Sequence, residues 1–373
     1  MAPTQDALYA DIDLELSWSE RDLPQRERTK HVHGLHPYLG KFIPQLVEVL
    51  LGRFFRPGQH VLDPFAGSGT TLVQALEGGL DATGSDVAAF NTLLMDVKTR
   101  AYNTFALERD VRDALRRFDE IAGDVGVAGC GPYVRRWFAP QAGAQLLAFR
   151  SLVGGEHADV LRVVLARAAR SARLTTHFDL DFPRAPMREP YWCHKHRRRC
   201  RPVEHADHFL RRYALDTVAR LRAFARSRRA GRAAHVRHGD ARELTWDGPY
   251  DGILTSPPYP GLIDYHEQHR YAYELLGLPD QRALEVGAAA HGTSRAALAA
   301  YVDGIVATLV HARAALRPDA PVVIVVHDRR ELYPGILERA GLRLDSRLRR
   351  HVNRRTGFRG GEFFEDVLVA RAS

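Results

Sequence analysis

Two short stretches of the sequence carry residue types and spacings that could act together in a chemical reaction. Residues 61–71 read VLDPFAGSGTT, and residues 255–259 read TSPPY. The glycines of the first stretch allow a tight turn and a close approach of the backbone to a ligand. The prolines of the second remove backbone donors and leave the Ser256 hydroxyl and the Pro257 carbonyl as acceptors. Together they predict a bound nucleoside cofactor beside an amine.

The first stretch is typical of a strand that ends at Asp63, a glycine turn and a helix that begins near Gly69. An anionic ligand group is favoured at such a helix start, which nearby hydroxyls can also cap. These hydroxyls belong to Ser68, Thr70 and Thr71. About 20 residues later Asp86 ends the next strand, where it can accept hydrogen bonds from ribose hydroxyls. Asp240 ends the third strand and is a candidate neighbour of an adenine ring.

Other readings of the glycine turn stay open or are disfavoured by spacing. The turn could be an ordinary loop. GSGTT lacks the third spaced glycine of GxGxxG, which disfavours a nicotinamide site, and no GxxxxGK[ST] phosphate loop occurs.

The second stretch suits an exocyclic base amine, whose lone pair is delocalised into the ring. Two acceptors that hold both N–H groups would turn this lone pair out of conjugation. Tyr259 offers a flat face on which a base taken out of a duplex could stack. The alternative is a plain proline turn after a strand.

Strand patterns alternate with helical patterns along the chain, which predicts an α/β fold with a mainly parallel sheet. We expect strands at 60–63, 81–86, 235–238, 250–255, 321–327, 342–349 and 363–370, the last two as an antiparallel hairpin. We expect helices at 70–77, 106–121, 140–152, 158–171, 205–227, 297–316 and 332–340. Residues 1–100 and 235–373 are predicted to form the catalytic domain, with a mostly helical insertion at 101–234.

These motifs resemble those of the amino-group DNA methyltransferases. LDPFAGSGTT is similar to the cofactor motif of that family, and HGLHPYLGKFIPQL, residues 33–46, to the motif that packs around the cofactor's methionine part. The resemblance implies a seven-stranded class I methyltransferase fold, Rossmann-like, with one antiparallel edge strand, and S-adenosylmethionine as cofactor. The residues expected at the cofactor are His36, Pro37, Phe42, Asp63, Pro64, Phe65, Gly67, Ser68, Gly69, Thr70, Thr71, Asp86 and Asp240.

TSPPY resembles the family's catalytic motif, in the form most often seen in N4-cytosine members; N6-adenine members more often carry Asp in place of Ser256. The resemblance implies base flipping and direct SN2 methyl transfer at Ser256, Pro257, Pro258 and Tyr259. An N6-adenine enzyme, an RNA or tRNA methyltransferase and a catalytically silent DNA-binding protein are the alternatives. A solitary enzyme and the partner of a restriction endonuclease are both compatible with the sequence, and the recognition sequence and oligomeric state are open.

Charge points to DNA as the partner. The formal net charge is +8, and residues 184–232 hold 15 Lys and Arg against 4 Asp and Glu. We expect target recognition in the insertion, with double-stranded DNA contacted by Arg188, Lys195, Arg197, Arg198, Arg199 and Arg201. The nearby CHKHRRRC, followed by His205 and His208, matches no strong zinc spacing, so no metal ligands are predicted; whether the Cys193–Cys200 segment binds a metal is left open.

Composition adds broad limits. Hydrophobic residues make up 45% and charged residues 26% of the 373, which is typical of a soluble globular protein. The sequence shows no continuous apolar run of membrane-spanning length and no apolar segment near its start, so we expect neither a membrane partner nor secretion. Three cysteines do not make a disulfide scaffold. The expected location is the bacterial cytoplasm, associated with the nucleoid.

Overall fold

The computed structural model describes residues 13–18, 21–40, 42–121, 130–177, 179–180, 182–352 and 364–372. The chain forms two compact units. The first comprises Met1–Thr99, Ser227–Asp264 and Arg282–Ser373, and the second comprises Arg100–Arg226 and Tyr265–Gln281.

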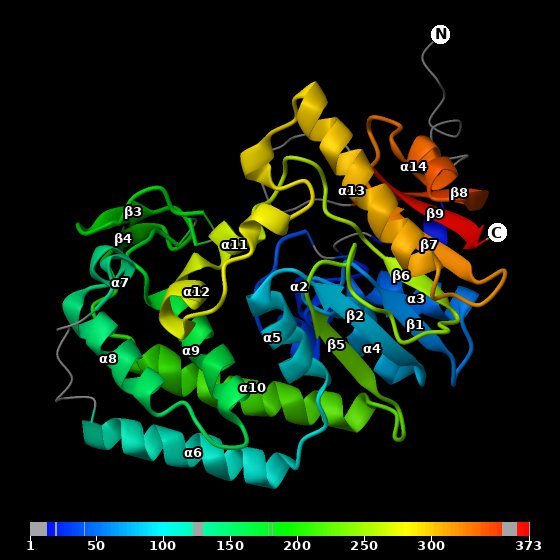
Figure 1. Ribbon diagram of the computed structural model, residues 1–373. Coiled ribbons are helices and arrows are strands. Elements are labelled where there is room, and N and C mark those ends of the chain that lie inside the picture. Colours follow the sequence, from blue (N-terminus) through cyan, green and yellow to red (C-terminus); the bar gives the residue numbers. More distant parts are fainter. Residues whose placement is uncertain are drawn as a thin grey trace. The chain divides into compact units, whose positions relative to one another are not determined.

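A seven-stranded sheet organises the first unit (Figure 1). Its strands are β1 (His60–Asp63), β2 (Asp81–Asp86), β5 (Ala234–His238), β6 (Gly252–Thr255), β7 (Pro321–Val326), β8 (Leu342–His351) and β9 (Phe364–Ala372). The spatial order is β5-β2-β1-β6-β7-β9-β8, and β9 runs antiparallel to both of its neighbours. The strand order reverses between β1 and β6, which is where open α/β sheets bind their ligands.

Helices cover both faces of this sheet because its strands alternate their buried side chains. Val61, Leu254 and Val323 point to a core shared with α3 (Pro44–Phe54) and α4 (Thr70–Gly78). Leu62 and Ile253 point to the opposite core, shared with α13 (Arg295–Arg313) and α14 (Tyr333–Arg339). Helix α5 (Ala89–Thr99) contacts α4, β2 and β5. The short elements of this unit are η1 (Leu14–Leu16), α2 (Gln25–Arg28), η2 (His31–Gly34), η3 (Arg282–Leu284) and η4 (Ala289–His291).

By length and composition, α13 could span a membrane, with 19 residues and a hydropathy of 1.2. Its apolar side chains Tyr301, Ile305 and Leu309 are instead part of the core against the sheet. A buried helix of a globular domain needs the same composition, so we interpret α13 as a core helix.

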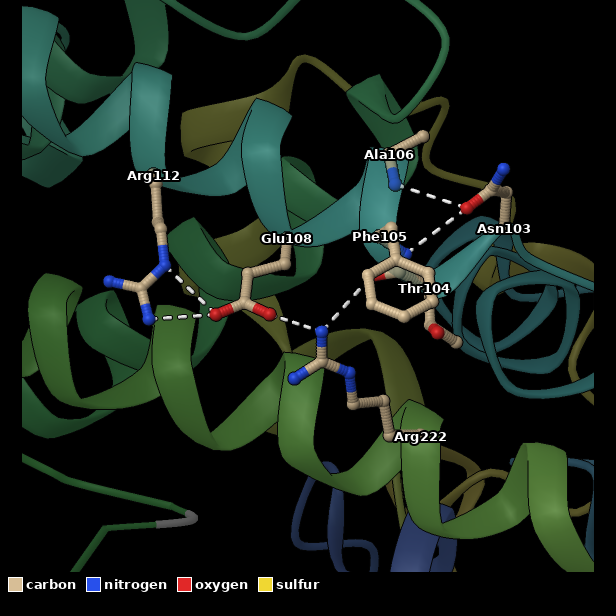
Figure 2. Close-up of polar contacts among 7 residues, drawn as sticks. All are labelled: Asn103, Thr104, Phe105, Ala106, Glu108, Arg112 and Arg222. Carbon is tan, nitrogen blue, oxygen red and sulfur yellow. Dashed lines mark hydrogen bonds and ion pairs between the residues drawn. The ribbon is translucent and has the colours of Figure 1, made fainter.

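The second unit is mainly helical. It contains α6 (Thr104–Ile121), α7 (Pro132–Trp137), α8 (Pro140–Ser151), α9 (Ala158–Ala172), α10 (Asp207–Ser227), α11 (Tyr265–Gln268) and α12 (Arg270–Leu276), and a hairpin of β3 (Tyr191–Cys193) and β4 (Arg198–Cys200). Figure 2 shows how α6 begins: the Asn103 carboxamide oxygen accepts from the backbone N–H groups of Phe105 and Ala106. Glu108 then pairs with Arg112 on α6 and with Arg222 on α10.

The structure confirms the predicted fold class and finds all seven predicted strands, with ends shifted by at most two residues where both ends are described. The start predicted at Phe363 lies outside the described residues. The antiparallel strand β9 lies one place in from the edge, between β7 and β8. Residues 265–281, which the sequence analysis places in the catalytic domain, belong to the second unit because α12 packs on α9 and α7.

Candidate active site

The carboxylate of Asp63 connects the two motifs. Asp63 ends β1 and is fully buried. One of its oxygens accepts a hydrogen bond of 2.6 Å from the Thr255 hydroxyl at the end of β6, and the other accepts one of 2.6 Å from the Thr71 hydroxyl in the first turn of α4. Since β1 and β6 are parallel neighbours, the glycine turn and TSPPY leave the sheet at the same edge.

Asp63 is therefore a buried link beneath the site. Burial raises the pKa of Asp63 to about 6. The hydrogen bonds from Thr255, Thr71 and the Phe65 backbone N–H favour the charged form and limit this rise. Both carboxylate oxygens are occupied by protein donors, so we infer that Asp63 positions the turn rather than meeting a ligand through its side chain.

The turn itself has the geometry that only glycine adopts easily. Gly67 has φ +53° and Gly69 has φ +81°. A Cβ atom at Gly67 would lie 2.9 Å from the Tyr38 hydroxyl oxygen, and one at Gly69 would lie 2.8 Å from Met95 Cγ. The backbone of the turn thus has no room for side chains at these two positions.

Two buried polar groups complete the turn. The Ser68 hydroxyl is buried and has no hydrogen-bond partner within the described part of the chain. The ammonium group of Lys98, a buried residue of α5, donates to the Ser68 carbonyl. Thr70 is also buried, and the Pro64 carbonyl accepts a hydrogen bond from the Ser85 hydroxyl.

The segment before α3 lies against this turn. Asn91 donates to the Tyr38 hydroxyl over 3.1 Å, and His36 meets the ring of Phe90 edge-on with 5.1 Å between centroids. His36 is buried, with Nδ1 2.7 Å from the carbonyl of the exposed Pro37. Phe42 does not join this wall, because its ring packs in the core with α3, while Phe65 is half-buried and packs against the core on the other face.

The two acidic residues predicted at the next strand ends lie in adjacent turns. The Gly239 backbone N–H donates to the Asp86 carbonyl over 3.1 Å, which joins the ends of β2 and β5. Asp86 accepts from the Ala88 backbone N–H. Asp240 pairs closely with Arg242; burial alone would raise the pKa of Asp240, but the Arg242 guanidinium lowers it.

TSPPY follows β6 directly. Ser256 is half-buried, and its hydroxyl makes no hydrogen bond to any described residue. Pro257 is buried and Pro258 is half-buried. Tyr259 donates to Glu365 of β9 over 3.1 Å, and its ring lies 6.2 Å from that of His327, which follows β7. The carboxylate of Glu365 is 3.6 Å from Nε of the buried Arg350, whose pKa is lowered by burial.

Comparison with known proteins gives the family. The family model described as DNA methylase matches residues 7–90. The type II methyltransferase M.MjaII of Methanocaldococcus jannaschii is 33% identical over 431 residues, covering 93% of this chain and 81% of the relative. The chain belongs to the amino-group DNA methyltransferases. M.MvaI of Kocuria varians, another type II methyltransferase, is 33% identical over 84 residues, which cover 22% of this methyltransferase and 18% of that protein.

Among solved structures, TrmN from Thermus thermophilus is 14% identical with a TM-score of 0.34, over 90% of this methyltransferase and 50% of TrmN. The rRNA methyltransferase aviRa from Streptomyces viridochromogenes is 14% identical with a TM-score of 0.34, over 91% of this chain and 89% of that chain. The strand order given above, not these likenesses, defines the fold.

S-adenosylmethionine is the cofactor of this methyltransferase family, and the site fits it. The glycine turn exposes backbone at the start of α4, where a carboxylate is favoured. The buried, unpartnered hydroxyl of Ser68 lies in that turn and can bind a polar group of the ligand. Bound there, the cofactor would supply an electrophilic methyl group.

The six predicted DNA contacts all lie in the second unit and are exposed. Arg188 donates to the Arg136 carbonyl. Within the described residues, no carboxylate pairs with the other five, Lys195, Arg197, Arg198, Arg199 and Arg201. By contrast, arginines on α6 and α10, such as Arg112, Arg211 and Arg222, form ion pairs.

One group of residues departs from the sequence analysis, which predicted no metal ligands. Nitrogen and sulfur atoms of His177, Cys193, His196 and Cys200 lie within 4.8 Å of one another. His205 and His208, which follow the CHKHRRRC segment, are not part of the group. His177 was missed because it lies 16 residues before Cys193, without a spacing that marks it.

Other residues at the site were also missed. Tyr38 lies within the HGLHPYLGKFIPQL motif, which the sequence analysis assigned to the cofactor site without naming this residue. No sequence pattern identified the other four as site residues: Asn91, Lys98, His327 and Glu365. Asn91 and Lys98 belong to α5, His327 follows β7 and Glu365 lies near the start of β9, so only the fold brings them to the site.

Proposed function

We propose that this methyltransferase methylates the exocyclic N4 atom of cytosine at a specific site in duplex DNA. The observation that carries the proposal is the unpartnered Ser256 hydroxyl, one residue from the junction of Thr255 with Asp63. Serine before the two prolines is the form that the resemblance associates with N4-cytosine. DNA methylation itself follows from the family.

The residues of the site suit this substrate. We propose that the Ser256 hydroxyl and the Pro257 carbonyl accept the two N–H groups of the base amine, which directs its lone pair out of the ring. The Tyr259 ring stacks on the flipped base and is held in place by Glu365. The transfer is direct, so the chain has to orient the amine and need not bond to it; positioning supplies most of the acceleration.

Nucleoside mass spectrometry on DNA from cells that express the full chain tests the proposal. We expect N4-methylcytosine. If N6-methyladenine alone is found, adenine rather than cytosine is the methylated base. If the DNA holds no modified base and RNA is methylated instead, the proposal is overturned. Sequencing that detects modified bases then gives the recognition site.

A variant links the product to the site. Ser256→Ala should lower turnover roughly 100-fold, as expected when one positioned hydrogen-bonding group is lost. Its affinity for S-adenosylmethionine, measured by calorimetry, should stay within about twofold. Thr245→Ala, which removes an exposed hydroxyl from the same unit, is the matched control and should leave both values unchanged. Normal turnover in Ser256→Ala would refute the role of this residue.

A further inference from the structure

The hairpin β3–β4 is too small to be held by its own apolar contacts. Each strand has three residues, and such hairpins are marginal in water. From residue 191 to residue 200, only Cys193 and Cys200 are buried. The turn residues 194–197 and the residues Arg198 and Arg199 are exposed. A conventional core therefore does not account for the order of this hairpin.

Both cysteines face the same side of the hairpin, toward two histidines. Tyr191 pairs with Cys200 and Cys193 pairs with Arg198, so Cys193 and Cys200 share one face. Cys193 Sγ is 3.4 Å from His177 Nδ1, and Cys200 Sγ is 3.4 Å from His196 Nδ1. The two imidazole rings are 4.4 Å apart between centroids. One face of the hairpin thus collects two sulfur and two nitrogen ligands.

These separations match a tetrahedral zinc ion. Zinc–sulfur bonds of about 2.3 Å and zinc–nitrogen bonds of about 2.05 Å at the tetrahedral angle set a sulfur–nitrogen separation of roughly 3.6 Å. The two thiolates also cancel the double positive charge of the ion, and the two neutral imidazoles add no charge. The site would therefore not repel the five cations of the hairpin region that no described carboxylate pairs with, Lys195, Arg197, Arg198, Arg199 and Arg201.

We propose that His177, Cys193, His196 and Cys200 bind one structural zinc ion that fixes the hairpin and the basic side chains on it. All four positions are taken by protein, so the ion is structural and has no open position for a substrate. Its binding releases the two thiol protons and supplies the stabilisation that the hairpin lacks.

A second group provides a contrast. Ligand atoms of His31, His33 and Glu77 also lie within 4.8 Å of one another. There the Lys30 ammonium is 2.9 Å from the Glu77 carboxylate. A protein cation already balances that carboxylate, and no thiolate is present, so we assign no ion to it.

Metal analysis of the full chain, purified without a histidine tag or chelators, tests the proposal. We expect about one zinc ion per chain. After zinc is removed under reducing conditions, Co²⁺ should restore one equivalent with the intense visible absorption of tetrahedral cobalt and the near-ultraviolet band of thiolate ligands. A chain that takes up neither ion, or whose Cys193 and Cys200 are joined as a disulfide, overturns the proposal without bearing on methyl transfer.

Variants separate this site from other cysteines and histidines. Cys200→Ser and His177→Asn should each lower zinc content at least tenfold. Cys130→Ser and His194→Asn are matched controls: Cys130 is a buried cysteine outside the group, and His194 lies in the same turn but is not one of the four ligands. Equal zinc content in all four variants would contradict the assignment. If a ligand variant is insoluble, the cobalt spectrum of the unaltered chain decides.

Discussion

At the scale of single residues, Asp63 shows how one side chain holds two motifs together. Its carboxylate bonds to Thr71 and Thr255, which belong to motifs 184 residues apart in the chain. The bonds make both motifs depend on a carboxylate that is fully out of solvent. The cost of burying that charge should appear as a pH dependence of stability.

We expect Asp63→Asn to remove this pH dependence. The folded pKa of about 6 lies above the ordinary aspartate value of 3.8, so the folded state holds the proton more tightly. The stabilisation from Asp63 is full below the unfolded pKa and is lost as pH rises through the folded value, by roughly 3 kcal/mol in total. From pH 4 to pH 7, the variant should therefore gain stability relative to the unaltered chain.

Urea unfolding of both proteins at several pH values measures this difference, since titrations elsewhere in the chain cancel. Asp251→Asn provides a control, because this partly buried aspartate accepts from the His60 backbone N–H at the opposite end of β1. A difference between the Asp63 variant and the unaltered chain that stays constant from pH 4 to pH 7 would show that burial does not shift this pKa.

Residue-level prediction from sequence was possible where a motif fixes both residue type and spacing. The glycine turn has the expected positive φ at Gly67 and Gly69, whereas the role of Ser256 stays a prediction. Lys98 and Glu365 were not found, because a lysine or glutamate has no local pattern that reveals a buried partner in another element.

At the scale of elements, short apolar runs between helical patterns predicted the sheet, because its central strands β1, β6 and β7 are almost entirely buried. The strand order was not predicted, because periodicity does not determine which strands are neighbours in a sheet. Helices α3 and α5 were not predicted, because they lie within or beside the motifs, whose residues were interpreted as functional rather than as helical. The hairpin β3–β4 was missed because six of its ten residues are charged or histidine, which is typical of a loop.

The hairpin also carries a prediction about DNA. The triple change Arg197→Gln, Arg199→Gln and Arg201→Gln removes three cations that no described carboxylate pairs with. If they contact phosphates, the dependence of log K on log salt should weaken by about 2.7, at 0.9 per contact. Fluorescence anisotropy with a duplex at several salt concentrations measures this slope.

A matched triple change on the paired arginines distinguishes the hairpin from general charge. Arg112→Gln, Arg116→Gln and Arg220→Gln remove the same charge from α6 and α10, where carboxylates already neutralise it. That variant should keep most of the slope. The same loss of slope in both variants would mean that net charge, not the hairpin, governs DNA affinity.

At the scale of the whole molecule, the two units divide the proposed tasks. Every predicted cofactor residue lies in the first unit, and every predicted DNA contact lies in the second. The chain passes between the units four times, because residues 265–281 return to the second unit after TSPPY. This return was not predicted, since α12 joins the second unit through packing on α9, a contact between segments about 100 residues apart.

This division predicts that salt affects the two ligands differently. DNA binding through five phosphate contacts should weaken roughly 500-fold when monovalent salt rises from 50 to 200 mM, because bound counterions are released. Binding of S-adenosylmethionine at a buried glycine turn involves few exposed charges and should change less than about threefold over the same range. Calorimetry for the cofactor and anisotropy for a duplex give the two curves on one protein preparation. Parallel loss of both affinities would place DNA and cofactor recognition in one electrostatic site and contradict the division. Cofactor affinity that holds steady while DNA is released would follow from the position of the five cations in the second unit, where no described carboxylate pairs with them.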